Sequence, residues 1–172
     1  MKEVKKEDLT YRMYGFVPYN ISEIQKGIQF GHAVVEYGLE YGQNPEYQKW
    51  AREDKTFIIL NGGTTNNMCT SPTSLPIGTL NQLELHILAS FPELNIARFS
   101  EPDLGDQLTA ICFLVDERVW DRERYPNFEH DRDFGISYIG QYKKWEKDTF
   151  GDCVDIDDII KMRNLLKKYK LA

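Results

Sequence analysis

The stretch from Ile21 to Gly38, ISEIQKGIQFGHAVVEYG, holds the side chains of this chain whose types and spacing best suit chemistry. Gln29 and His32 are three positions apart, so on a helix they share one face and could act on one ligand. A histidine here could be reactive or could be a structural hydrogen-bonding group. Because Val34 and Val35 follow His32, we expect its imidazole to lie partly inside, and the structural role is favoured.

The residues before this pair have the pattern of a helix N-terminus. Ser22 and Gln25 match the S-x-x-Q capping box, in which each side chain bonds to the other residue's backbone. The same helix start presents free N–H groups and a positive dipole end that could hold an anion. Lys26 could assist that anion, or it could simply be solvated.

A polar loop after a predicted strand, LNGGTTNN at residues 60–67, is a second candidate. It offers small polar groups at Thr64, Thr65 and Asn66. It is neither a G-x-G-x-x-G loop nor a Walker A loop. A plain turn is therefore the simpler interpretation.

The segment SEPDLGDQLT, residues 100–109, is a third candidate because it places three carboxylates between two predicted strands. Glu101, Asp103 and Asp106 could orient a ribose or an amine, or act as a general base. A solvated acidic turn is an equal alternative.

Regular elements that could position these groups are predicted along residues 11–115. Apolar runs predict strands at residues 11–19, 56–61, 95–99 and 108–115, the last one buried on both faces. Ile24, Ile28, Val35 and Leu39 recur at helical spacing after the first strand, and Gly42 and Pro45 end that helix. A second helix is predicted from Thr79, its expected N-cap, to Pro92. The order β-α-β-α-β-β indicates an α/β layered sheet.

The last third of the chain has a different composition. Residues 116–134 are dense in charge of both signs, and two amphipathic helices are predicted at residues 137–147 and 155–172. We therefore divide the chain into an α/β core, 1–115, and a helical extension, 116–172, packed on the core or used between subunits.

Composition limits the classes of function. The chain has 172 residues and a formal net charge of −6. A negative charge disfavours a protein that binds long nucleic acid through its phosphates. Its three cysteines form no CxxC pair or His/Cys cluster, so neither a metal site nor a disulfide framework is indicated. No apolar run suits a membrane span and no secretory signal is apparent. We expect a cytoplasmic protein without a cofactor.

From Tyr11 to Val115 the chain resembles the peptidyl-tRNA hydrolase 2 family. That family carries M-S-x-G-K-x-x-x-Q-x-x-H-A after its first strand, and IS-EIQKGI-Q-FG-HA matches at Ser22, Gln29, His32 and Ala33. KTFIIL is similar to its middle strand, and EPDLGDQLTAICFLV to its acidic turn and Thr-led last strand. The resemblance implies a three-layer α/β/α fold with a mixed four-stranded sheet, and a homodimer.

The resemblance also implies site residues, with two departures. The family's catalytic lysine belongs four residues before the matched glutamine, where this chain has Gln25. Its aspartate is approximated by Glu101, and its threonine by Thr109. Lys26 is adjacent to the lysine position, but one residue turns a helical side chain by about 100°.

Two hypotheses follow, with a third behind them. In the first, the chain is a degenerate relative that binds a small anionic or nucleotide-like ligand at this helix start. The lining residues would be Asn20, Ser22, Gln25, Gln29, His32, Thr64, Thr65, Asn66, Glu101 and Asp103. In the second, it is an active peptidyl-tRNA hydrolase that uses Lys26, Glu101 and Thr109 on tRNA. In the third, it is a partner-binding protein that docks through its C-terminal helix.

Overall fold

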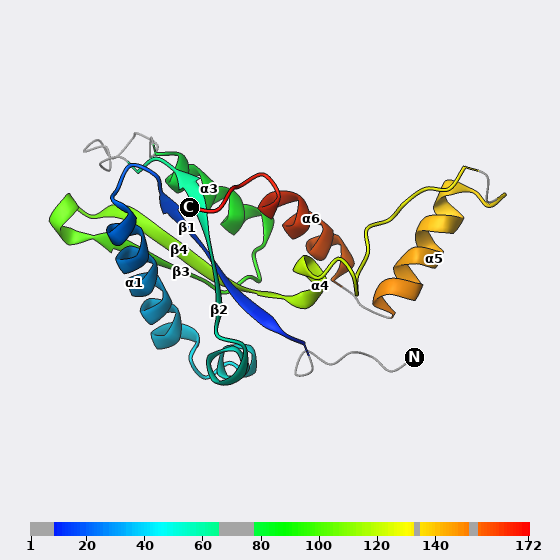
Figure 1. Ribbon diagram of the computed structural model, residues 1–172, viewed down its shortest axis with the longest axis horizontal. Helices are drawn as coiled ribbons and strands as arrows, with labels where there is room; N and C mark the ends of the chain where they lie inside the picture. Colours follow the sequence, from blue (N-terminus) through cyan, green and yellow to red (C-terminus); the bar gives the residue numbers. More distant parts are fainter. Residues whose placement is uncertain (1–8, 66–77, 133–134, 152–154) are drawn as a thin grey trace.

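The computed structural model describes residues 9–65, 78–132, 135–151 and 155–172. A mixed four-stranded sheet forms the centre, in the order β2-β1-β4-β3 (Figure 1). The strands are β1 (Tyr11–Pro18), β2 (Thr56–Gly63), β3 (Ile96–Glu101) and β4 (Gln107–Asp116). β1 and β2 run parallel and are joined by a helical crossover, whereas β4 is antiparallel to both β1 and β3. The predicted α/β class is therefore confirmed.

The two central strands are the most apolar ones. Every residue of β4 from Leu108 to Val115 is buried, as predicted for a strand covered on both faces. β1 is buried along almost its whole length, with Arg12 the only residue that is not. Their side chains supply most of the core, including the fully buried Phe16 and Phe113, whose ring centroids are 6.1 Å apart.

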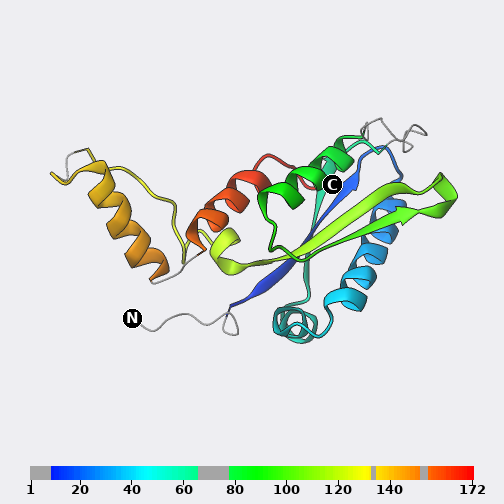
Figure 2. The same cartoon turned by 180° about the vertical axis from the view of Figure 1, so that it is seen from behind.

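Helices cover both faces of the sheet (Figure 2). α1 (Glu23–Tyr41) lies on one face and α3 (Thr79–Ser90) on the other. A Cβ at Gly15 would overlap the Phe30 ring of α1, and one at Gly62 would meet Leu80 of α3 at 2.6 Å. Glycine at these two strand positions therefore allows each helix to approach the sheet closely.

α1 turns an unexpected face toward the sheet. Its buried residues are Gln29, Phe30, Ala33 and Tyr37. The stripe of apolar residues that predicted the helix is exposed instead: Ile24, Ile28, Val35 and Leu39. Periodicity identified the helix and its end at Gly42, but not which of its two apolar faces packs on the sheet.

Short helices occur where no periodic pattern had predicted them. These are α2 (Pro45–Lys49), the π-helix η2 (Trp50–Asp54), the 3-10 helix η3 (Pro102–Leu104) and α4 (Glu117–Trp120). Each has five residues or fewer, which is too short for a helical period to show in the sequence. α3 begins with Thr79 as its first residue, so that Gly78, rather than Thr79, is the N-cap.

The C-terminal residues divide into two parts. α6 (Ile156–Leu166) packs beside α4, and the Tyr169 ring meets Phe16 edge-on at 4.9 Å. Leu171 forms an antiparallel bridge with Leu60 at the outer edge of β2. α5 (Tyr138–Phe150) stands away from the sheet (Figure 1). None of the helices among the described residues is long and apolar enough to cross a bilayer.

Candidate functional site

Gln29 joins three elements through one buried side chain. Its Nε2 donates to Glu101 Oε2 at the end of β3, at 2.6 Å. Its Oε1 accepts from the Thr109 hydroxyl on β4, at 2.7 Å. Thr109 is fully buried and Gln29 nearly so, so both polar groups depend on these bonds. Three of the predicted site residues, separated by up to 80 positions, therefore form one network.

A β-bulge between β3 and β4 orients the Thr109 side chain toward Gln29. Phe99 pairs with Ala110 and Ser100 pairs with Leu108, so Thr109 is left as an extra residue in β4. Such a β-bulge turns a side chain away from the regular alternation of the strand. The hydroxyl of Thr109 thus points to α1 and meets Gln29.

His32 lies at the edge of the same site. Its ring stacks on Phe99 of β3 with 4.5 Å between centroids. The residue is exposed, which corrects the expectation of a partly buried imidazole. Three positions along the helix turn it by about 60° from Gln29, so Gln29 points inward while His32 reaches solvent.

The start of α1 is capped as its sequence predicts. The Ser22 Oγ accepts from the Gln25 N–H at 3.3 Å, and the Gln25 Oε1 accepts from the Ser22 N–H at 3.0 Å. Gln25 is therefore engaged in the cap. Among the described residues, no group accepts from the N–H of Glu23 or Ile24, the first two of the helix.

Lys26 is the nearest cation of α1 to Gln29, and it has a partner. Its ammonium lies 2.8 Å from Glu23 Oε1, and only 12% of its side chain is exposed, against 81% for Glu23. Because Lys26 and Gln29 are three positions apart, they occupy neighbouring positions on the helix surface. The ammonium is thus directed to an exposed carboxylate in the first turn of the helix, three positions before Lys26, whereas Gln29 lies three positions after it.

Other predicted ligand residues build the loops around the helix start. The Asn20 side chain and the Thr65 backbone exchange two hydrogen bonds, at 3.2 and 3.3 Å. The Thr65 hydroxyl donates to the Leu108 carbonyl at 2.6 Å, and Thr64 meets the Thr79 side chain. These groups fasten the end of β2 to the β1–α1 turn and to β4. Asn66 lies outside the described residues.

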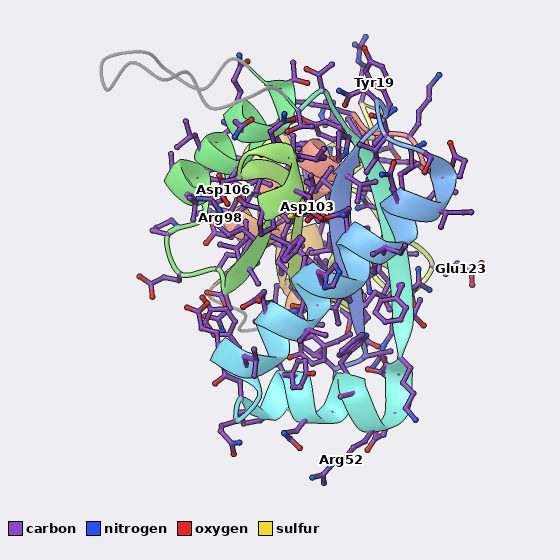
Figure 3. The ribbon with its side chains drawn as sticks, turned by 90° about the vertical axis from the view of Figure 1, so that its left-hand side faces the viewer. Tyr19, Arg52, Arg98, Asp103, Asp106 and Glu123 are labelled. Atoms are coloured by element: carbon purple, nitrogen blue, oxygen red, sulfur yellow. The ribbon has the colours of Figure 1, made fainter. Side chains whose placement is uncertain are left out.

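The acidic turn between β3 and β4 is exposed beside α1 (Figure 3). η3 ends at Gly105, and both Gly105 and Asp106 have positive φ angles of 68° and 58°. Glu101 is half-buried and reaches the network, whereas Asp103 and Asp106 point to solvent. Of the three carboxylates, only Glu101 is therefore part of the site.

A cavity at the opposite end of the sheet was not predicted. It has a volume of about 330 Å³ and lies between the end of α1, the segment that joins α3 to β3, the end of β4 and α6. Its carboxylates are those of Glu46, Glu93, Asp116, Asp155 and Asp158. Burial, together with Asp116 and Glu46, raises the pKa of Tyr11, and burial raises that of Tyr37. Arg118 is also in the lining and pairs with Asp116, so the carboxylates outnumber the cations there. These residues are too dispersed in sequence to form a motif.

As far as the structure describes the chain, the polar side chains of this site are bonded to one another and include no activated nucleophile. Within the described ranges, no cluster of three or more His, Cys, Asp or Glu side chains could hold a metal ion. The Cys112 thiol donates to the Ala33 carbonyl, and burial raises its pKa to about 12, so it is not a nucleophile at neutral pH. Neither models of known protein families nor curated proteins match this chain.

Proposed function

We propose that this chain is a divergent relative of the peptidyl-tRNA hydrolase 2 family that binds a small anionic or nucleotide-like ligand instead of hydrolysing an ester. The mixed four-stranded sheet with helices on both faces supports the resemblance. So does the meeting of Gln29, Glu101 and Thr109, the residues that the resemblance matched to the family's site.

The main support for binding without hydrolysis is that the Gln29 network contains no group free to activate water. Gln29 occupies both Glu101 and Thr109 with its own amide. The position where the family has its lysine is Gln25, which is bound in the helix cap. Hydrolysis needs a group that activates water or stabilises the developing negative charge. The network alone supplies a carboxylate and a hydroxyl that are already paired.

The residues around the start of α1 would bind the anionic part and the remaining part of a nucleotide-like molecule at two neighbouring places. The first-turn N–H groups of Glu23 and Ile24, with the Lys26 ammonium, would receive the anionic part. The carboxylate oxygen of Glu101 that Gln29 does not use would accept from ligand hydroxyls, and the exposed His32 ring could face a base. Ligand binding would exchange the Lys26–Glu23 ion pair for a contact with the anion.

An active hydrolase is the second candidate, and the position of Lys26 favours it. Its side chain is mostly covered and adjoins Gln29 on the helix surface. In this alternative the ammonium leaves Glu23, takes the role of the family lysine, and orients a water with Glu101.

Release of peptide from peptidyl-tRNA by purified protein separates the two candidates. We expect no turnover above background by the wild type. Turnover that is lost in both Lys26→Ala and Glu101→Ala would overturn the binding proposal. We further expect Gln25→Lys to gain turnover, with Gln25→Ala as the control that removes the cap partner without adding an ammonium.

A panel of nucleotides in a thermal unfolding assay tests binding directly. A ligand at 100 times its Kd stabilises the fold by about 2.7 kcal/mol. Lys26→Ala should weaken that effect, and Lys143→Ala, an exposed lysine of α5, should leave it unchanged. If no nucleotide raises the melting temperature, the proposed ligand class is wrong.

A further inference from the structure

The cavity between the end of α1, the α3–β3 segment, the end of β4 and α6 has the size and the lining of a ligand site. Its volume of about 330 Å³ is near the lower end of the range for sites that bind small molecules. Its floor is apolar and well packed, since five of the side chains that line it are at most 9% exposed: Tyr37, Leu114, Val119, Ile159 and Met162. Such a floor suits the hydrocarbon part of a ligand.

The charged groups of the lining are mostly acidic, and two of the five carboxylates have a cation beside them. The Asp116 carboxylate lies 2.8 Å from the guanidinium of Arg118, which also lines the cavity. The Asp158 carboxylate lies 2.9 Å from the ammonium of Lys161, at the surface of α6. These two pairs leave three carboxylates of the lining to be explained.

Glu46, Glu93 and Asp155 are those three carboxylates. Within the parts of the chain that the structure describes, no lysine or arginine lies within 4 Å of any of them. They belong to three separate segments, namely α2, the α3–β3 segment and the residue before α6. A cleft whose charges have one sign attracts ions of the opposite sign. The cavity therefore suits a cation from outside the chain.

Two polar side chains of the lining do not serve the helices that they precede. Asn44 is the N-cap of α2 and Asp155 the N-cap of α6, yet neither side chain accepts a hydrogen bond from its helix. Asparagine and aspartate are residues that ordinarily make this bond. Neither side chain makes another hydrogen bond within the described ranges. Both line the cavity instead, where their oxygens can accept from a ligand.

The spread of these groups indicates an extended organic cation. A metal ion needs ligands that converge, and no three His, Cys, Asp or Glu side chains among the described residues do so. An aliphatic polyamine has ammonium groups separated by methylene segments, so it matches separated carboxylates around an apolar floor. We propose that the cavity binds a linear aliphatic polyamine, with its ammonium groups at Glu46, Glu93 and Asp155 and its methylene chain on the floor. This proposal concerns the end of the sheet opposite Gln29 and does not depend on the function proposed above.

Isothermal titration calorimetry with spermidine is the first test. One spermidine should bind per chain, and hexylamine, which has a single ammonium group, should bind about tenfold more weakly. Glu46→Gln and Asp155→Asn should each weaken spermidine binding by about fivefold, the effect of one partly exposed ion pair. Glu123→Gln, at an exposed carboxylate outside the lining (Figure 3), makes the same change of net charge and should bind spermidine as the wild type does.

Leu94→Trp tests whether the amine occupies the cavity, because it changes volume and leaves charge unchanged. Leu94 is half-buried in the lining, so the larger indole would fill part of the space and should abolish the heat of spermidine binding. Leu85→Trp, at a 48% exposed position of α3 outside the lining, is the matched control and should bind normally. Circular dichroism checks that both variants fold, and the carboxylate variants carry the test if Leu94→Trp does not.

Three results would overturn the proposal. The absence of saturable heat with spermidine would show that the cavity binds no polyamine. Affinity that stays at the wild-type value in both Glu46→Gln and Asp155→Asn would place the amine elsewhere on this acidic chain. Equal affinities of spermidine and hexylamine would show that the separated carboxylates do not act together.

Discussion

Gln29 is the residue on which the candidate site depends most. Its amide satisfies a carboxylate on β3 and a fully buried hydroxyl on β4 at the same time. A buried polar group that loses its partner costs more than the bond itself contributes. The network is therefore both a structural joint between α1 and the sheet and the floor of the proposed binding site.

We expect Gln29→Ala to lower the free energy of unfolding by about 1–3 kcal/mol, because it removes the donor to Glu101 and leaves Thr109 only the longer contact, 3.4 Å, with the Phe99 carbonyl. Denaturant titration measures this change. Gln82→Ala on the exposed surface of α3 is the matched control and should stay within about 0.5 kcal/mol of wild type. Equal effects of the two substitutions would contradict a structural role for the network.

Glu84 on α3 is a buried carboxylate whose pKa is raised by burial, although Arg98 at 3.3 Å lowers it in part. The folded chain therefore keeps this proton to a higher pH than the unfolded chain does. Its contribution to stability is full below the ordinary glutamate pKa and is lost as the pH rises through the raised value.

It follows that Glu84→Gln should raise the melting temperature at neutral pH and bring little gain well below the ordinary pKa of glutamate. Melting curves across this pH range measure the difference. Glu93→Gln, an exposed glutamate after the same helix, should show no such trend. A gain that is equal at all pH values would rule out titration of Glu84 as its cause.

At the scale of elements, the N-cap of α1 holds the start of this helix at the edge of the candidate site. Ser22 and Gln25 satisfy one another's backbone N–H groups, and Gln29, one turn further along the helix, makes the bond to Glu101 at the end of β3. The helix enters the sheet layer from a β1–α1 turn that Asn20 and Thr65 hold in place.

Ser22→Ala should cost about 1 kcal/mol of stability, because it removes the side-chain acceptor of the Gln25 N–H at the start of a helix whose later turns pack on the sheet. Ser137 caps α5 in the same way, through the Gly140 N–H, but α5 stands away from the sheet. Hydrogen exchange of Ser137→Ala should accelerate only in α5. Global loss in that variant would show that α5 is coupled to the core.

At the scale of the molecule, Arg163 holds the C-terminal third together. It is 4% exposed and donates to the carbonyls of Arg118 and Tyr125 and to the Asn127 side chain. Burial lowers its pKa to about 10, so it is still charged at neutral pH. α6 is thereby joined to α4 and to the segment that leads to α5.

Arg163→Met should destabilise the fold by about 3 kcal/mol, since it leaves buried carbonyl groups unpaired while keeping the volume of the side chain. Thermal unfolding measures the loss. Lys161→Met, on the exposed side of α6 with one ion pair to Asp158, is the control and should change little. A small effect of Arg163→Met would show that packing of α6 alone holds this region.

The sequence by itself determined the four strands, the four longer helices α1, α3, α5 and α6, and the cap at Ser22. These are local properties: an apolar run, a spacing of three and four, or a Ser and a Gln at the right interval decide them. It also indicated Gln29, Glu101 and Thr109 as separate candidate site residues, through the resemblance of their motifs to those of the peptidyl-tRNA hydrolase 2 family.

Only the tertiary structure decided how these residues meet. The register of β3 against β4 makes Thr109 the extra residue of a bulge and so turns it to Gln29, and no local pattern encodes that pairing. Likewise α1 has two apolar faces. Close approach at Gly15 selects the one with Phe30, because that ring fills the space a Cβ would occupy, and the stripe from Ile24 to Leu39 is left to solvent.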